Sequence, residues 1–365
     1  MNSRLEKLRA QLDELQLDAL IVSHNADQRY LTGFSGHADF DSVMVVAKNA
    51  ACVITDFRYK QIAEAESGMP VTMTERGKLE LPQALANFAQ ENTLRDIGFE
   101  SQHVTVYRLG EWQKALRKVG AKLKPTADVI KTLRAWKDED EIEKIRAAVK
   151  LTDDTFSYLR QTIRAGMTEK QIAWMIEAYM REHGAERMAF DPIVASGPNA
   201  ALPHAEPTSR QVREGEPITI DMGAQLDGYN SDMTRTITLG HATEKFNEIY
   251  RIVLKAQLAV EKKARVGMNG KQIDRLARRI IDKAGYEKEF GHGTGHGVGR
   301  VVHEFPRAGK TFKKDKFEPN MLLTVEPGIY IPDWGGVRIE DLVVFRENGL
   351  EILTQSTKAP LIPIA

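Results

Sequence analysis

The sequence predicts an α/β protein of two domains, a smaller N-terminal domain over residues 1–130 and a larger C-terminal domain over residues 131–365. Three observations lead to this prediction. A chain of 365 residues exceeds the usual size of a single hydrophobic core. Strand-like and helix-like apolar patterns alternate through its first part, and a sequence repeat runs through its second part.

The N-terminal domain begins with a predicted amphipathic helix and continues with strands and helices. Four leucines recur every three or four residues and therefore share one helix face: Leu5, Leu8, Leu12 and Leu15. Apolar runs of strand length follow at residues 19–22, 43–46 and 51–54. Residues 82–91 then predict a helix, with Pro82 at a tolerated position in its first turn. This order of elements indicates an α/β domain.

Composition excludes several classes of function. The chain carries 51 Lys and Arg residues against 51 Asp and Glu residues, so no overall field attracts nucleic acid or an acidic membrane. Its single cysteine, Cys52, lies in an apolar run, which favours a buried side chain over a reactive thiol. The N-terminus lacks a signal-peptide pattern, and no segment approaches the ~18 apolar residues of a membrane span. We therefore expect a cytoplasmic protein without nucleic-acid or membrane partners.

The C-terminal domain begins with an acidic cluster and contains a repeat. Residues 136–141 end in clustered acids ahead of periodic apolar residues, which is the pattern of a helix N-terminus. Farther on, the segment 166–172 (Gly-Met-Thr-Glu-Lys-Gln-Ile) returns 101 residues later as 267–273 (Gly-Met-Asn-Gly-Lys-Gln-Ile). Gly184 and Gly285 end both predicted helices at the same offset. We expect two copies of one structural unit.

Each copy of the repeat is followed by an apolar strand that carries an acid and turns back toward a second acid. In the first copy the strand reaches Asp221, a turn follows at residues 227–228, and the returning chain carries Asp232. In the second copy the corresponding acids are Glu326 and Glu340, on either side of another turn. Two hairpins related by a pseudo-twofold axis would bring both pairs of carboxylates to one central cleft.

Four carboxylates on apolar strands predict bound metal cations. Any one of them alone is best explained as an exposed strand acid, but buried acids need partners and like charges repel strongly in a low dielectric. His296, in the glycine-rich run 291–297, adds an imidazole. This run lacks the Lys-Ser/Thr ending of a phosphate-binding loop, and its glycines instead suit a backbone that approaches metal and substrate closely. The oxygen-rich set suits Mn²⁺ or Co²⁺, with Zn²⁺ and Fe²⁺ as alternatives.

These residues resemble the metal ligands of the aminopeptidase P and prolidase family of pita-bread metallopeptidases. Four motifs carry the resemblance: Asp-Met-Gly-Ala-Gln-Leu-Asp-Gly-Tyr-Asn-Ser-Asp at 221–232, His-Gly-Thr-Gly-His-Gly at 292–297, Val-Glu-Pro-Gly-Ile-Tyr at 325–330 and Gly-Gly-Val-Arg-Ile-Glu-Asp at 335–341. The resemblance covers residues 150–365 and extends into the first domain through residues 31–36 and 55–59. It implies a creatinase-like N-terminal α/β domain followed by a pseudo-twofold pita-bread catalytic domain.

The resemblance also implies a role for each ligand. Asp221 would bind one of two divalent metals, and Asp232 and Glu340 would bridge both. His296 and Glu326 would complete the second metal site. A water between the metals would be the nucleophile, made reactive by metals about 3.5–4 Å apart. Glu326, next to this water, would be the general base.

Four further residues are expected to handle the substrate, and two of them, His204 and His303, match further family positions. His204, in Leu-Pro-His-Ala, and His303, in Val-Val-His-Glu, would bind substrate and handle protons or the oxyanion as catalytic residues. His292 would bind substrate or brace the glycine-rich loop. Arg338 lies two residues before Glu340 and would face the same side of the strand, as a partner of the ligands or of a substrate carboxylate. Taken alone, each of these side chains would more often have a structural role.

We therefore expect a metal-dependent enzyme that cuts peptides next to proline. The overall pattern of residues 31–36 and 55–59 favours an Xaa-Pro aminopeptidase over the alternative, an Xaa-Pro dipeptidase (prolidase) restricted to dipeptides. Methionine aminopeptidases generally lack a first domain of this kind, and creatinase-like hydrolases lack the full ligand set. An inactive member that acts as a binding protein would show a replaced ligand, whereas all the ligand positions are occupied here. The family also suggests a homodimer.

Overall fold

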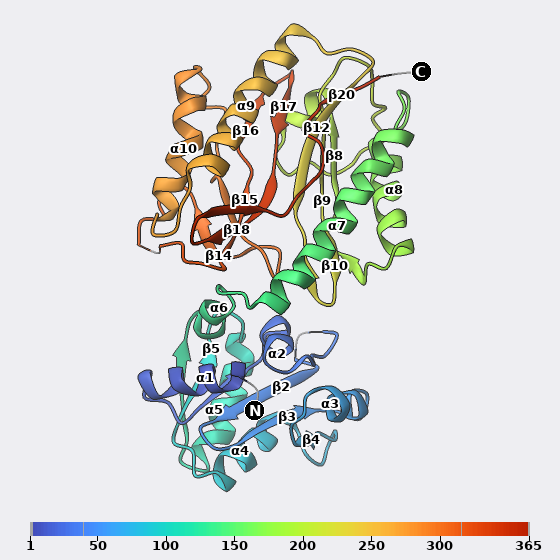
Figure 1. The fold of residues 1–365 in the computed structure, drawn as a ribbon. Coiled ribbons are helices and arrows are strands. Elements are labelled where there is room, and N and C mark those ends of the chain that lie inside the picture. Colours follow the sequence, from blue (N-terminus) through green and yellow to red (C-terminus); the bar gives the residue numbers. More distant parts are fainter. Residues whose placement is uncertain (1–2, 39, 315, 364–365) are drawn as a thin grey trace. The chain divides into compact units, whose positions relative to one another are not determined.

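The protein divides into two compact units, Met1–Arg134 and Ala135–Ala365, shown in the computed structural model of Figure 1. The structure describes residues 3–38, 40–314 and 316–363. Both units combine helices with strands, which confirms the α/β fold class that the sequence predicts. No helix among the described residues has both the length and the apolar character that a membrane span needs.

One sheet forms the centre of the first unit. Its strands are β1 (Ala19–Val22), β2 (Ser42–Ala47), β3 (Ala51–Thr55), β4 (Val71–Met73), β5 (Asp96–Glu100) and β6 (Lys122–Thr126). They lie in the order β4-β3-β2-β1-β5-β6, with antiparallel pairing among β1, β2 and β3 and parallel pairing toward both edges. The three predicted strand segments lie within β1, β2 and β3. Cys52 is buried in β3, as predicted, and burial raises the pKa of its thiol to about 12.

The helices of the first unit are α1 (Ser3–Glu14), α2 (Asn25–Thr32), α3 (Lys60–Glu66), α4 (Leu81–Glu91), α5 (Val106–Arg117) and α6 (Val129–Leu133). The two helices that the sequence predicts in this unit are present as α1 and α4, and the first differs from the prediction at its end. Pro82 lies in the first turn of α4. Leu8 and Leu12 of α1 are fully buried, but the prediction is wrong for Leu15, which lies beyond the helix and is 46 % exposed. Gln16, the next residue, has a φ of 52°, and this left-handed conformation ends the helix there, so Leu15 falls in the terminal turn and not in the buried stripe.

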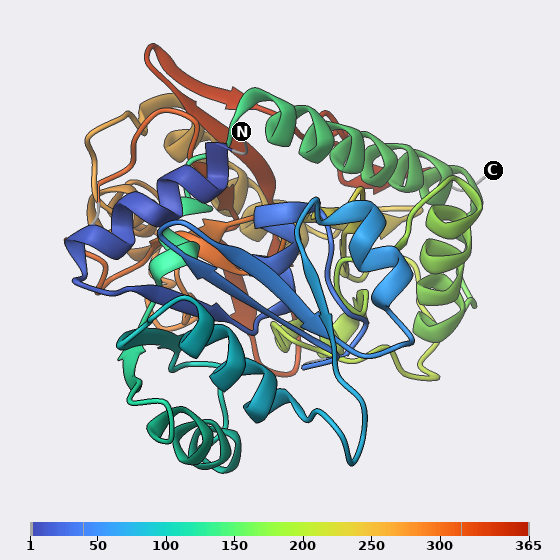
Figure 2. The ribbon, with the colours of Figure 1, turned by 90° about the horizontal axis from the view of Figure 1, so that it is seen from below.

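The helices of the second unit preserve the repeat. They are α7 (Glu139–Thr162), α8 (Glu169–Glu182), α9 (Glu244–Lys263) and α10 (Gly270–Lys283), with a 3₁₀ helix, η1 (Gly197–Ala201). Figure 2 shows α7 and α8, in green, side by side. Helices α8 and α10 start at equivalent positions, where Thr168 and Asn269 cap them with the same reciprocal hydrogen-bond pattern. Gly184 and Gly285 follow the two helices with φ of 103° and 91°.

Two strand pairs in the second unit correspond to the two predicted hairpins. The strands are β7 (Arg187–Met188), β8 (Ile193–Ser196), β9 (Ile218–Met222), β10 (Ala224–Leu226), β11 (Tyr229–Asn230), β12 (Met233–Leu239), β13 (Gly295–Gly297), β14 (Glu304–Ala308), β15 (Leu322–Val325), β16 (Gly328–Ile331), β17 (Gly335–Arg338), β18 (Asp341–Arg346), β19 (Gly349–Ile352) and β20 (Leu361–Ile362). Strand β9 pairs antiparallel with β12, and β15 pairs antiparallel with β18. Between the members of each pair the chain adds a shorter ribbon, β10–β11 or β16–β17.

Separate hydrophobic clusters hold the two strand pairs in place. Ile172 of α8 and Ile220 of β9 belong to one buried cluster. Ile273 of α10 and Leu323 of β15 belong to another. Burial of one such side chain contributes about 1.5–3 kcal/mol. Each half of the repeat therefore fixes its own strand pair against its own helix.

Candidate metal centre and pocket

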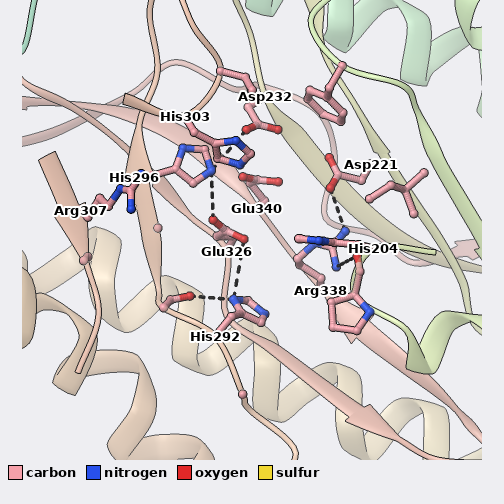
Figure 3. Close-up of a pocket in the computed structure, with 18 of the residues that line it drawn as sticks. His204, Asp221, Asp232, His292, His296, His303, Arg307, Glu326, Arg338 and Glu340 are labelled. Carbon is pink, nitrogen blue, oxygen red and sulfur yellow. Dashed lines mark hydrogen bonds and ion pairs between the residues drawn. The ribbon is translucent and has the colours of Figure 1, made fainter. Parts of the chain in front are cut away.

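A pocket of about 880 Å³ in the second unit collects the predicted site residues (Figure 3). Its lining includes all of them: His204, Asp221, Asp232, His292, His296, His303, Glu326, Arg338 and Glu340. These residues come from both halves of the repeat and from the loops between them. Assembly of the pocket therefore requires both halves to fold.

The four carboxylates lie near the points where the chain passes between a strand pair and the ribbon inserted in it, β10–β11 or β16–β17. Asp221 lies within β9, opposite Thr234 of β12. Asp232 lies just before β12, Glu326 just after β15, and Glu340 between β17 and β18. The prediction that all four lie on strands is therefore wrong for three of them. The reason is that each added ribbon interrupts its strand pair at these positions.

The imidazole of His296 faces the carboxylates. Its Nδ1 lies 3.0 Å from the carbonyl oxygen of Gly297, which can only accept, so Nδ1 carries the proton and the lone pair of Nε2 is available. Nε2 lies 3.7 Å from Asp232 Oδ2 and 3.4 Å from Glu326 Oε1. One donor atom each from Asp232, His296 and Glu340 lie within 4.8 Å of one another. This arrangement of one imidazole and carboxylates suits a divalent cation.

Hydrogen bonds orient the carboxylates but leave one buried oxygen unsatisfied. Thr234 Oγ1 donates to Glu340 Oε2 over 2.6 Å. Arg338 Nη2 donates to Asp221 Oδ2 over 2.8 Å. Asp221 Oδ1 is buried and has no hydrogen-bond partner among the residues that the structure describes. A buried carboxylate oxygen in this state is costly unless a cation binds it.

Burial and mutual repulsion perturb the carboxyl groups. Burial raises the pKa of Asp232 well above its ordinary value, and the negative charges of Glu340 and Asp221 add to the effect. The pKa of Glu340 is raised well above its ordinary value by burial and by Glu326. Burial also raises the pKa of Glu326. Divalent cations would offset both the burial and the repulsion, so this hard, oxygen-rich donor set fits a metal centre.

Two histidines border the pocket from loops on either side of the carboxylates. His204 follows η1, and His303 directly precedes β14. The ring of His303 lies 4.3 Å from the ring of His296, with 64° between their planes. Partial burial, together with the neighbouring His296 and Arg307, lowers the pKa of His303 to about 4. The imidazole of His303 is therefore neutral at neutral pH.

His292 is braced by a chain of hydrogen bonds. Its Nδ1 lies 2.7 Å from the carbonyl oxygen of Gly293, and its Nε2 lies 2.9 Å from the hydroxyl of Tyr330. Arg338 Nη1 donates to the same hydroxyl over 2.9 Å, so the hydroxyl proton is left to point at His292. Burial lowers the pKa of His292, which favours the neutral ring that this pattern requires. The bracing role that the sequence indicated for His292 thus has defined partners.

Three glycines of the run 291–297, Gly293, Gly295 and Gly297, lie where a Cβ would meet the backbone of a neighbouring strand. A Cβ on Gly295 would lie 1.8 Å from the carbonyl oxygen of Thr324, and a Cβ on Gly293 would lie 2.6 Å from that of Ala308. The expectation that these glycines let the backbone approach metal and substrate is therefore corrected at these three positions. Strand β13 lies against both β14 and β15, and only glycine permits that spacing at these positions.

Several pocket residues were not predicted. Arg307 of β14 lies opposite His296 of β13, and directly opposed residues of an antiparallel pair direct their side chains to the same face. Figure 3 shows its guanidinium beside His296. The sequence contained one sign of this role, because Arg307 is a basic residue just after the His303 motif. Tyr330 and a group of apolar side chains complete the walls: Phe190, Ile193, Pro203, Val302 and Phe312.

Comparison with known proteins gives consistent matches over the whole chain. Residues 143–347 match the model of metallopeptidase family M24, and residues 4–136 match the creatinase/prolidase N-terminal domain. The chain is 37 % identical to the Xaa-Pro dipeptidase of Pyrococcus furiosus, over 98 % of this chain and 99 % of that protein. A solved Xaa-Pro dipeptidase from Bacillus anthracis superimposes with a TM-score of 0.93 at 36 % identity, covering 99 % of both chains. An X-Pro aminopeptidase from Thermotoga maritima superimposes with a TM-score of 0.88 at 35 % identity, covering 97 % of this chain and 100 % of the other.

Proposed function

Because the chain belongs to metallopeptidase family M24 and carries a creatinase/prolidase N-terminal domain, we propose that it is a two-metal Xaa-Pro dipeptidase, or prolidase. The observation that carries this proposal is Arg307, whose guanidinium lines the pocket on the same face as His296. A dipeptide ends in a carboxylate one residue after the bond that is cut. Arginine binds carboxylates through two parallel hydrogen bonds, so Arg307 would recognise that terminus.

The names of related proteins support the dipeptidase over the aminopeptidase that the N-terminal motifs favoured. Relatives named Xaa-Pro dipeptidase are 35 % and 37 % identical to the chain over 98 % of its length. Several solved structures with TM-scores of 0.86 to 0.93 also carry the names Xaa-Pro dipeptidase or prolidase. The dipeptidase, which was the alternative from the sequence, is therefore the main proposal.

The site would hold two divalent cations. The proposed ligands are Asp221, Asp232, His296, Glu326 and Glu340. The unsatisfied oxygen of Asp221 and the repulsion around Asp232 support this assignment. When bound, the cations would polarise the scissile carbonyl and lower the pKa of the attacking water. We propose Mn²⁺ as the native metal because the donors are mainly oxygens; the homodimer and the cytoplasmic location stay predictions.

Glu326 would accept the proton of the attacking water. Its Oε1 already accepts from Thr324 Oγ1 over 3.1 Å, so Oε2 is the oxygen that would take the proton. The carboxylate is thus oriented for this role.

His204 and His303 would act on the scissile amide. Both side chains line the pocket, and His303 stays neutral at neutral pH because its pKa is lowered to about 4. A neutral imidazole can donate a hydrogen bond to the oxygen that becomes negative, and it can relay to the departing nitrogen the proton that Glu326 takes from the attacking water. Between them, the two histidines would stabilise the oxyanion and relay the proton from Glu326 to the proline nitrogen.

The pocket walls suit a proline ring. Phe190, Ile193 and Phe312 are among the apolar side chains that line it. A pyrrolidine ring presents apolar surface and no backbone N–H, so apolar walls without hydrogen-bonding groups suit it. We propose that these side chains contact the proline and that Arg338, buried against Asp221, holds that ligand in place.

Rates on two matched substrates test the proposal. The manganese-loaded enzyme is given Xaa-Pro and Xaa-Pro-Xaa peptides with the same first residue. We expect a higher kcat/KM for the dipeptide, because only the dipeptide presents its carboxylate to Arg307. A preference for the tripeptide would replace the proposal with aminopeptidase activity, and no turnover of either substrate would contradict both.

Aminopeptidase activity is the second candidate. The similarity to the X-Pro aminopeptidase of Thermotoga maritima favours it. The comparison of the two substrates separates the candidates directly.

A further inference from the structure

Glu169 is a completely buried carboxylate at the start of α8. Its Oε1 accepts from the backbone nitrogen and the hydroxyl of Ser196, over 2.7 and 2.8 Å. Its Oε2 accepts from the backbone nitrogen and the hydroxyl of Thr208, over 2.9 and 2.6 Å. The side-chain amide of Asn199 donates to both oxygens over 3.1 Å. One side chain thus joins both ends of the segment 196–208.

The segment 196–208 carries His204. Besides its contacts with Glu169 of α8, it lies against strand β17. A Cβ at Gly336 of β17 would lie 2.2 Å from a carbonyl oxygen of this segment, so the two backbones are in contact. Arg338 of the same strand donates from Nη1 to the carbonyl oxygen of Pro203 over 3.3 Å. The segment is therefore held between α8 and the strand that supplies Arg338 to the pocket.

The helix does not need the Glu169 carboxylate for its own capping. Thr168 already caps α8 through the backbone nitrogen of Gln171. Burial by itself raises the pKa of Glu169, but the hydrogen bonds from Thr208 and Ser196 outweigh it, so the pKa is lowered. The buried charge is thus stabilised by the segment that it holds.

The other half of the repeat lacks this arrangement. The equivalent position is Gly270, where a Cβ would lie 2.0 Å from a carbonyl oxygen of β14. In that half Arg278 of α10 holds the glycine-rich loop, because its Nη2 donates to the carbonyl oxygen of His292 over 2.6 Å. Glu169 is therefore not part of the capping pattern that both halves share. It occurs only in the half that contains the loop with His204.

We propose that Glu169 is a positioning residue that fixes His204 for catalysis by clamping both ends of the segment 196–208. The inference rests on the proposed function, in which His204 acts on the substrate. Loss of the clamp would let the segment move, and a misplacement of ~1 Å can cost ~10²-fold in rate. The hydrogen bonds of Glu169 involve none of the proposed metal ligands, so metal binding should be retained.

Three variants separate positioning from general stability. Glu169→Gln keeps the shape of the side chain but turns one oxygen into a donor that faces the donors of Ser196 or Thr208. Thr168→Ala is the matched control, because it weakens the same helix end but leaves the Glu169 clamp in place. Thr208→Val removes one hydroxyl from the clamp. If Glu169→Gln does not fold, this variant tests whether the clamp positions His204.

The full-length, manganese-loaded variants are compared in kcat, KM, metal content, melting temperature and hydrogen exchange of residues 197–208. We expect Glu169→Gln to lower kcat by at least ~10-fold with little change in KM, since the segment carries His204, whereas the walls proposed to contact the proline lie outside it. Metal content should be unchanged, and exchange in residues 197–208 should rise. Thr208→Val should show a smaller change in the same direction. Thr168→Ala should lower the melting temperature without changing kcat or this exchange.

Wild-type kcat and exchange in a folded Glu169→Gln, or in Thr208→Val if the first variant does not fold, would overturn the inference. Equal losses of kcat in Glu169→Gln and Thr168→Ala would also overturn it, because both changes would then act through stability. If the wild-type enzyme fails to cut Xaa-Pro, the proposed function fails. The exchange comparison still decides then whether Glu169 holds the segment, so the two failures are distinguishable.

Discussion

Arg338 and Asp221 form a buried ion pair in which the guanidinium Nη2 donates to Asp221 Oδ2 over 2.8 Å. The other oxygen, Asp221 Oδ1, is buried without a hydrogen-bond partner in the described part of the chain. The arginine therefore fixes the orientation of the carboxylate and leaves one oxygen for a cation. A buried arginine next to four acids also reduces their repulsion without occupying the place of a metal.

Hydrolysis should depend on divalent metal. The proposed ligands surround a cluster in which Asp232, His296 and Glu340 donor atoms lie within 4.8 Å of one another. We expect chelation to abolish turnover of a proline dipeptide and Mn²⁺ or Co²⁺ to restore it. Elemental analysis of each preparation provides the control. Full activity in a preparation shown to be free of metal would contradict the two-metal proposal.

Glu326→Gln should lower kcat by at least ~10²-fold, the lower range for loss of a general base. The change removes the charge that accepts the proton but keeps the shape and the hydrogen bond from Thr324. Turnover and metal content are measured together, because the same residue is a proposed ligand. Near-normal turnover with full metal content would remove Glu326 from the role of base.

His204→Ala and His303→Ala should each lower turnover by at least ~10²-fold while metal content and the melting temperature stay near the wild-type values. Both residues lie on loops that border the pocket and not in an apolar core. Loss of stability or of metal in step with activity would show that the histidine is structural or ligating. Normal turnover would exclude that histidine from catalysis.

Arg307→Ala should raise KM for Xaa-Pro more than for the same dipeptide with an amidated C-terminus. The reason is that the amide lacks the charge that the guanidinium would bind. Lys310→Ala is a control that removes an exposed positive charge nearby in the sequence but outside the pocket lining. Equal effects of Arg307→Ala on the two substrates would show that Arg307 does not recognise the carboxylate.

The stability of Glu261→Gln relative to the wild type should increase as the pH rises from about 5 to 8. Burial and the neighbouring Asp341 raise the pKa of Glu261 to about 7, against about 4.3 for an ordinary glutamate. The folded wild type therefore binds a proton that the unfolded chain releases in this window, so it loses stability as the pH rises through it. Melting temperatures of wild type and variant at several pH values test this, with Glu248→Gln as a control on the exposed face of α9. A pH-independent difference would contradict the prediction.

Local patterns explain why much of the fold and the pocket could be predicted. The caps of α8 and α10, the glycines that follow them and the strand–turn–strand order each depend on a few adjacent residues. The acids at Asp221 and Glu326 stand out because they interrupt apolar runs. The stripe of α1 failed at Leu15 because a single residue with positive φ ended the helix, and a periodic pattern does not contain that information.

The sequence by itself determined the repeat, the two acid-bearing hairpins and the nine predicted residues that line the pocket. Only the tertiary structure decided that Arg307 lies opposite His296, that Arg338 engages one oxygen of Asp221, and that Glu169 holds both ends of the His204 loop. The physical reason is that these relationships join segments distant in the chain. The packing of complete side-chain layers sets which residues of distant segments face each other, and no local stretch of sequence specifies that packing.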